Sequence, residues 1–201
     1  MKHALGIAIL ALVSGTATVC ITQQVYAQKS YVDPQYHKAS YEDIQRPAEP
    51  VSVKVDVEFQ RNGTPLPAVN NELRGHVERI LRASGVFTPS TSSTPTNVNV
   101  MANNIADLAA ARKKGFKTGL TFGAAGSMVD DNYEFACVFR DGSGQDHKYS
   151  YQHAIHTAIG RKKPPATDLK PTTPADAFGH VVEDVILNFL KDLQDGGLMP
   201  K

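Results

Sequence analysis

Cysteine is scarce in this chain of 201 residues, which contains only Cys20 and Cys137. Cys20 ends an apolar N-terminal stretch that we expect to be removed on export or, in the alternative case, to carry a lipid. Neither outcome leaves a pair of thiols for an intrachain disulfide, so a small domain held together by disulfides is excluded. Cys137 occupies an apolar position in the alternating run "YEFACVFRD". We therefore expect it to be a buried and chemically inert thiol.

An excess of charge of either sign is also missing. The chain has 21 basic and 20 acidic side chains, and Lys2 is the only charged residue among residues 1–27. Without those residues, 20 basic side chains balance 20 acidic ones. No basic stripe with interleaved aromatic residues occurs. Nucleic acid is therefore not an expected partner.

Motifs that carry known chemistry are absent as well. There is no Gly-x-Ser-x-Gly elbow, and the glycines of "GLTFGAAG" do not match either phosphate-binding pattern, so we expect no cofactor and no catalytic residue. Glycine inside a strand more often marks a bulge or a close backbone approach. Asp130 and Asp131 lack the alternating acidic residues and the final glutamate of a calcium loop, so we predict a hairpin turn there.

The N-terminus "MKHALGIAILALVSGTATVC" has a short polar start followed by an apolar run without charge. This is the arrangement of a secretory signal peptide over residues 1–27. Small residues at Val25 and Ala27 favour cleavage before Gln28. An uncleaved membrane anchor is the alternative, although the most apolar part is about half of the roughly 20 residues that a spanning helix needs. We expect the protein to be periplasmic or secreted.

Cys20 offers a second route to the envelope. Bacterial lipoproteins are cleaved directly before a cysteine that then carries the lipid, and the residue before it is usually Gly, Ala or Ser. Val19 stands there in this chain and should fit poorly. Soluble export is therefore our main expectation. A membrane tether through Cys20 is the alternative.

The domain organisation follows from a change of pattern at residue 51. Residues 28–50 are polar and lack apolar periodicity, which predicts an extended arm or tether, whereas residues 51–197 read as a single α/β domain. "VSVKVDVEFQ" alternates strictly, as a strand with one dry and one wet face does. It therefore belongs to a sheet that is covered on one side. Asn62-Gly63 predicts a turn, and a helix is expected over residues 68–84. Gly85 suits the left-handed position that follows a helix.

The rest of the domain alternates between strands, turns and helices. We expect a short strand over 97–102, a short helix over 103–115 with Asn104 as its cap, and three strands over 117–129, 133–140 and 147–159. Turns at 130–132 and 141–146 join the three strands. Thr173 and Pro174 mark the start of a long amphipathic helix. Together these elements predict an α/β fold of the α+β type. It is a two-layer sandwich with a mostly antiparallel sheet and two main helices packed on one face.

Two histidines, His153 and His156, are three residues apart in "YSYQHAIHTAIG". On a helix this spacing would direct both imidazoles to one metal ion, which would suit a hydrolase. The β-branched and aromatic residues around them favour a strand instead. Residues three apart on a strand point to opposite faces. We therefore predict no shared metal ion.

Two groups of charged residues are candidates for contact with a partner. Lys54, Asp56 and Glu58 lie on the wet face of the first strand. The second group, Arg161, Lys162 and Lys163, forms a basic cluster before two prolines, and a solvated loop is its simpler interpretation.

The order of these segments is similar to that of uncharacterised, lipoprotein-like cell-envelope proteins of Gram-negative bacteria. The residues that carry the resemblance are the export signal, "PVSVKVDVEFQRNG", "NELRGHVERILRASGVF", "TGLTFGAAGSMVDDNYEF", "YQHAIHTAIG" and "AFGHVVEDVILNFLKDLQ". The resemblance covers residues 51–194, and it implies a periplasmic location and no established enzymatic activity. Val19 departs from the lipoprotein pattern.

From these observations we expect a non-catalytic binding or assembly module whose partner is another envelope protein or envelope component. A lipid-binding transport accessory is one alternative, and it would need an apolar cavity between helices and sheet. A hydrolase built around the two histidines is the other.

Overall fold

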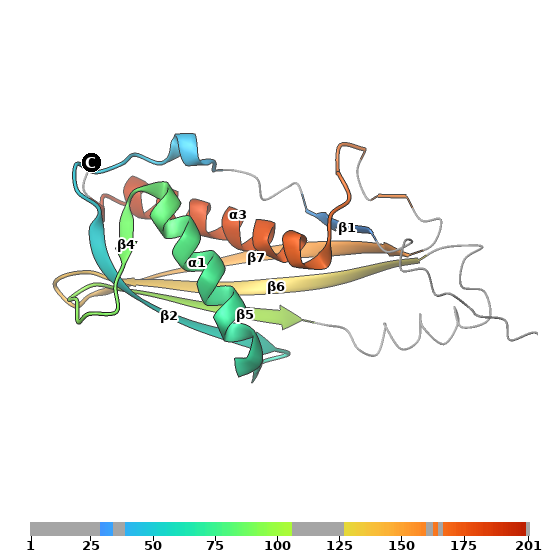
Figure 1. Cartoon of the computed structure of the whole chain (residues 1–201), viewed down its shortest axis with the longest axis horizontal. Coiled ribbons are helices and arrows are strands. Elements are labelled where there is room, and N and C mark those ends of the chain that lie inside the picture. Colours follow the sequence, from blue (N-terminus) through green and yellow to red (C-terminus); the bar gives the residue numbers. More distant parts are fainter. Residues whose placement is uncertain (1–28, 34–38, 106–126, 160–162, 165–166, 200–201) are drawn as a thin grey trace, which may run out of the picture.

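The computed structural model describes residues 29–33, 39–105, 127–159, 163–164 and 167–199. Helices α1 (Asn70–Ser84) and α3 (Pro174–Asp195) pack on one face of a seven-stranded sheet (Figure 1). The strands are β1 (Lys29–Val32), β2 (Val51–Arg61), β3 (Thr64–Pro65), β4 (Phe87–Pro89), β5 (Asn97–Ile105), β6 (Ser127–Arg140) and β7 (Asp146–Ile159). Short 3₁₀ helices, η3 (Tyr41–Asp43) and η4 (Pro67–Val69), precede β2 and α1. The predicted two-layer α+β sandwich is confirmed.

The sheet has the strand order β1-β7-β6-β5-β2-β3, and β4 pairs with β2 beside this path. Strands β2 and β5 run parallel from the pair Lys54 and Asn97 to the pair Arg61 and Asn104, and the β2–β4 pair is also parallel. The pairs β1–β7, β7–β6, β6–β5 and β2–β3 are antiparallel. Parallel neighbours need a crossover connection, which α1 and β4 provide between β2 and β5.

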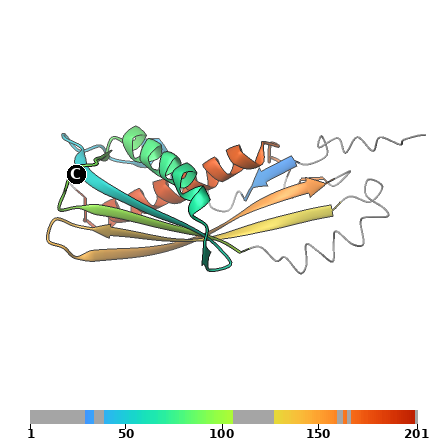
Figure 2. The same ribbon diagram turned by 60° about the horizontal axis from the view of Figure 1, so that its bottom comes forward.

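Both helices cover the same face of the sheet, as Figure 2 shows with α1 and α3 above the strands. The alternation predicted for β2 holds, because Val53, Val55 and Phe59 are buried while Lys54 is exposed. α3 buries the largest apolar stripe, which consists of Phe178, Val181, Val182, Val185, Ile186, Leu187, Phe189, Leu190 and Leu193. Burial of a large apolar side chain contributes about 1.5–3 kcal/mol, so this helix is a main source of stability.

The helix and turn signals of the sequence are confirmed in detail. Thr173 caps α3 by accepting a hydrogen bond from the backbone N–H of Asp176 at 3.1 Å, and Pro174 takes the first helical position. α1 ends at Gly85, whose φ of 74° suits the left-handed position after a helix. Asn62 and Gly63 have φ of 51° and 75°, the pair of positive values that a tight hairpin turn requires.

The turn predicted at residues 130–132 is wrong, because β6 continues through these residues from Ser127 to Arg140. All fourteen residues of β6 pair with β7, from Ser127 opposite Ile159 to Arg140 opposite Asp146. Asp130 and Asn132 are exposed, so their presence in a strand costs little stability although both residue types favour turns. The turn at 141–146 is confirmed, with Asp141 and Gln145 joined by a backbone hydrogen bond of 3.0 Å.

The strand after the surface loop is longer than predicted. β5 extends to Ile105, so Asn104 lies inside a strand and is not a helix cap. Asn104 is buried, and its carbonyl accepts a hydrogen bond from the N–H of Asn62 at 2.9 Å, so pairing to β2 overrides the local cap signal. The remainder of the predicted helix and most of the predicted strand at 117–129 lie outside the described residues.

The segment 28–50, expected to be an extended arm or tether, takes part in the domain. β1 pairs antiparallel with the end of β7, and Tyr31 is buried. Ile44 also belongs to the hydrophobic core. The backbone hydrogen bonds of β1 and the burial of one isoleucine are long-range effects, which the lack of local periodicity could not reveal.

Candidate functional site

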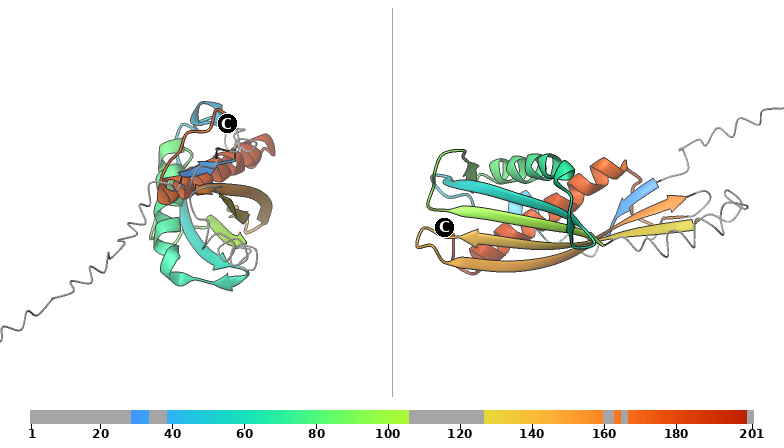
Figure 3. Two further views of the ribbon diagram at one scale, coloured as in Figure 1. Left: turned by 90° about the vertical axis from the view of Figure 1, so that its right-hand side faces the viewer. Right: turned by 90° about the horizontal axis from the view of Figure 1, so that it is seen from below.

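The face of the sheet opposite the helices is polar, and Figure 3 (right) shows its strands in front of α3. β2, β5, β6 and β7 each turn every second side chain to this side. The register places Asp56 beside Asn99, Asn99 beside Val138 and Val138 beside Lys148. We call this surface the open face.

A shallow depression of about 610 Å³ lies on the open face near the β6–β7 turn. Its lining combines both charge signs with amides, and consists of Lys54, Asp56, Thr94, Pro95, Asn97, Asn99, Val138, Arg140, Asp146 and Lys148. Side chains from four strands thus meet in one surface feature. Such a surface can make hydrogen bonds and ion pairs with a polar ligand or with another protein.

Four of the charged side chains of the depression form two ion pairs, Lys54 with Asp56 and Arg140 with Asp146. Lys54 Nζ lies 2.9 Å from Asp56 Oδ2, which also accepts a hydrogen bond from Asn97 Nδ2 at 2.8 Å. Burial acts to raise the pKa of Asp56, but the hydrogen bonds from Lys54 and Asn97 outweigh it, so the pKa is lowered. Arg140 binds Asp146 through two hydrogen bonds, Nε to Oδ1 at 2.7 Å and Nη2 to Oδ2 at 3.1 Å. These contacts hold the surface polar groups in defined positions.

The structure brings together only part of the predicted interaction residues. Lys54 and Asp56 line the depression, whereas Glu58 lies farther along the same face and accepts a hydrogen bond from Gln60 at 2.6 Å. Lys163 is exposed and follows the end of β7 that is remote from the β6–β7 turn. Arg161 and Lys162 lie outside the described residues. Among the described residues, Lys163 therefore does not line the depression with Lys54 and Asp56.

The two histidines lie on β7, as predicted. His153 faces α3 and is 2% exposed, and its Nε2 lies 3.1 Å from Oδ2 of Asp184, which is 7% exposed. The backbone N–H of Ala154 donates to His153 Nδ1 at 2.9 Å. Nδ1 also lies 3.3 Å from the carbonyl oxygen of Ala154, so the donor and acceptor roles of the two ring nitrogens depend on the tautomer. His153 thus connects the sheet to the long helix.

His156 points to the other face and has different partners. Its Nδ1 lies 2.8 Å from Asp130 Oδ1 of β6, and its Nε2 lies 3.7 Å from Asp33 Oδ2 beyond β1. The two imidazoles therefore contact different carboxylates, on opposite faces of the sheet. Within the described residues, no group of three or more metal-ligating side chains has a geometry that could hold an ion. That the protein binds no zinc stays a prediction.

Cys137 is completely buried in the middle of β6. Burial raises the pKa of its thiol far above the ordinary value, so the reactive thiolate is disfavoured. The expectation of a buried thiol is confirmed.

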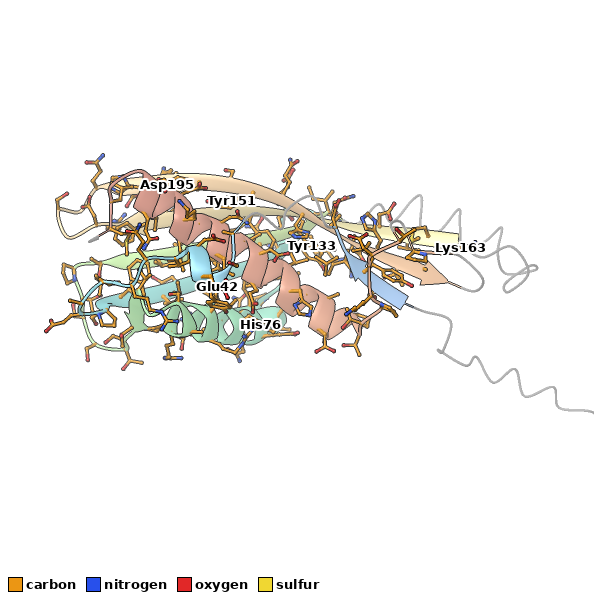
Figure 4. All side chains as sticks on the ribbon, turned by 90° about the horizontal axis from the view of Figure 1, so that it is seen from above. Glu42, His76, Tyr133, Tyr151, Lys163 and Asp195 are labelled. Carbon is orange, nitrogen blue, oxygen red and sulfur yellow. The ribbon has the colours of Figure 1, made fainter. Side chains whose placement is uncertain are left out.

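Sequence reasoning missed a pocket of about 480 Å³ between α3 and the outer edge of β7. Figure 4 shows Tyr151 beside the C-terminal half of α3, and its hydroxyl donates a 2.6 Å hydrogen bond to Asp192 Oδ2. Burial and this carboxylate raise the pKa of Tyr151 far above the ordinary value. Asp184, which interrupts the apolar stripe of α3, was the sequence signal that could have pointed to a polar contact here.

Similarity to known proteins is found among solved structures and not at the level of sequence. No family model matches the chain, and no curated protein sequence matches it. A minor lipoprotein from Acinetobacter baumannii is similar in structure with 10% identity and a TM-score of 0.36, over 75% of this chain and 96% of that chain. The PelC dodecamer from Paraburkholderia phytofirmans is similar with 12% identity and a TM-score of 0.37, over 74% of this chain and 93% of that chain. These similarities transfer no functional residue to this chain.

Proposed function

We propose that this protein is an exported bacterial envelope protein that acts as a non-catalytic binding or assembly module. The single observation that supports the proposal most is the open face. A sheet with helices on one side presents a rigid, polar surface of four strands on the other, and its depression is lined by held charges and amides. Rigid polar groups lose little conformational entropy when a partner binds.

The nature of the surface favours a polar partner. Lys54, Arg140 and Lys148 line the depression together with Asp56 and Asp146. A partner with complementary charges can replace these intramolecular pairs or extend them, which gives specificity more than affinity. Another envelope protein, or a charged component of the envelope, fits this chemistry.

Side chains occupy the space between the sheet and the helices, which argues against a lipid carrier. Phe135, Phe139 and Phe189 are buried between sheet and helices, together with the apolar stripe of α3. Four pockets in the described part of the chain lie at the surface and have charged residues in their linings. A carrier would need an apolar cavity of the size of an acyl chain in this layer.

The cellular location of the protein needs a separate test. The signal that predicts it falls within the first 28 residues, which lie outside the described part of the chain. Within the described residues, neither helix has the length and apolarity to cross a bilayer. We expect intact-mass measurement of the protein from native cells to show an N-terminus at Gln28. A diacylglyceryl group on Cys20 would instead place the domain on a membrane, and a retained Met1 in the cytoplasm would contradict export.

The binding role is tested by reversing charges on one face at a time. The variant Lys54→Glu/Lys148→Glu alters the open face, and Arg79→Glu/Arg82→Glu makes the same change of net charge on the exposed side of α1. Each variant is purified from envelope fractions, and the proteins that accompany it are quantified by mass spectrometry. We expect the open-face variant to lose the partner of the wild type by about tenfold, as charge reversal at an interface does. Equal loss from both variants would contradict the proposal.

A further inference from the structure

The outer edge of β7 is only partly occupied. β1 pairs with β7 from Ala158 to Ile155, and the backbone N–H of Asp33 then donates to the carbonyl of Ala154 at 3.1 Å. Beyond this point, residues 146–153 have β6 on one side and no strand on the other, within the part of the chain that the structure describes. An unpaired strand edge is a ready template for another extended chain.

The register shows which backbone groups face outward. Ala154 directs its carbonyl to the β1 side, and backbone groups of a strand alternate direction with each residue. The backbone N–H and C=O groups of Lys148, Ser150 and Gln152 therefore point outward, away from β6. All three residues are exposed. β1 demonstrates that this edge accepts an antiparallel strand.

α3 forms a wall along this edge, and the pocket of about 480 Å³ lies between them. Ser150 and Gln152 line it from β7, while Asp184, Asn188 and Asp192 line it from α3. The three helix residues are spaced by four, so they form one row on the helix surface. Two of the three are carboxylates, and Lys191 of α3 pairs with Asp195 outside the pocket. The wall is therefore acidic.

We propose that the β7 edge binds an extended peptide segment of a partner protein, which adds a strand after β1 and places a Lys or Arg side chain in the pocket against α3. Backbone hydrogen bonds to Lys148, Ser150 and Gln152 supply the affinity, and the acidic row supplies the specificity, which is the usual division in strand addition. The basic character of the partner follows from charge complementarity with Asp192, the exposed carboxylate of this row. Lys148 contributes its side chain to the depression of the open face and its backbone to this edge, so the variants used here are at Ser150 and Asp192. With these variants the inference can fail while the proposed function holds, and the proposed function can fail while the inference holds.

The test uses two synthetic octapeptides, one with alternating Thr and Lys and one with alternating Thr and Glu. Binding to the full-length mature protein is measured by fluorescence anisotropy at low salt, and amide exchange is followed by NMR with and without peptide. We expect the Lys peptide to bind about tenfold more tightly than the Glu peptide. We also expect it to slow exchange at the amides of Lys148, Ser150 and Gln152.

Matched variants separate backbone pairing from charge. Ser150→Pro removes the outward N–H and should weaken binding of the Lys peptide about tenfold, whereas Ser150→Ala keeps that N–H and should bind as the wild type does. Asp192→Asn can still accept the hydrogen bond of Tyr151 but loses the charge, so it should reduce the preference for the Lys peptide. Asp195 lies outside the pocket, so Asp195→Asn should leave the preference for the Lys peptide unchanged. Thermal unfolding of each variant checks that it is folded.

Three results would overturn the inference. The first is that both peptides bind equally tightly, or that neither binds. The second is protection of the three amides that increases with protein concentration in the absence of peptide, because the edge would then be occupied by a second copy of this chain. The third is unchanged binding in folded Asp192→Asn.

Discussion

The two faces of the sheet use charged residues in opposite ways. On the face covered by helices, His153 and Asp184 are buried and hydrogen-bonded to each other. On the open face, His156 has the exposed Asp130 as its partner, and Lys54 pairs with Asp56 beside solvent. A buried polar group without its partner is expensive, whereas an exposed one can turn to water. The covered face is therefore constrained by stability, whereas polar groups of the open face can change their contacts at little cost to the fold.

The largest expected effect is that of Val185→Asp on the covered face. The carboxylate would be buried without a partner, which costs about 3–5 kcal/mol and approaches the total stability of many domains. We expect the variant to lose its cooperative thermal transition. Lys148→Asp introduces the same group on the open face and should keep that transition. If both variants unfold alike, the comparison of the two faces is wrong.

A smaller effect is expected when one carboxylate is removed from each histidine. Asp184→Ala removes the carboxylate that contacts Nε2 of buried His153, and we expect it to lower the free energy of unfolding by about 1–3 kcal/mol. Asp130→Ala removes a partner of the partly exposed His156 and should cost less than about 1 kcal/mol. Urea titration followed by circular dichroism measures both. A larger loss in Asp130→Ala would show that the open face also carries the stability of the fold.

Acid should weaken the turn that closes the β6–β7 hairpin. The hydrogen bond with His147, followed by that with Ser143, lowers the pKa of the Asp141 carboxyl far below its usual range. A lowered folded-state pKa stabilises the protein above the unfolded pKa of about 4, and this contribution is lost as the pH falls towards the folded-state pKa. We expect Asp141→Asn to show a smaller loss of melting temperature between pH 5 and pH 2 than the wild type. Parallel curves would contradict this role.

The smallest effect is expected at Lys54. Lys54 Nζ and Asp56 form an exposed pair, so Lys54→Met should change the free energy of unfolding by about 0.5 kcal/mol or less. The same urea titration measures it. A loss near that of Asp184→Ala would mean that the ion pairs of the depression are structural, and that they are not available to a partner.

The regular elements could be predicted from local patterns. The cap at Thr173, the left-handed glycine at Gly85 and the turn at Asn62 each depend on neighbours in the chain, and all three are confirmed. The alternation of apolar and polar residues in β2 likewise indicated that the sheet has one covered and one exposed face.

Features that depend on distant residues were not predictable in the same way. Asp130 favours a turn locally, but it lies in a strand because β7 pairs along the entire length of β6. The position of β1 beside Ile155, and the pocket between β7 and α3, arise from contacts that no local pattern encodes. At the candidate site, sequence reasoning identified Lys54 and Asp56 but not the residues of β5, β6 and β7 that complete the depression, because strand order determines them.

Photo-crosslinking in native cells tests the central claim most directly. A photoreactive amino acid replaces Asn99, exposed on the open face, or Asn71, exposed on α1, one position at a time. The account predicts a discrete adduct of the same partner from position 99, lost in the Lys54→Glu/Lys148→Glu background, and no such adduct from position 71. An adduct from position 71 alone, or one from position 99 that survives the charge reversal unchanged, would contradict the claim that the open face is the recognition surface.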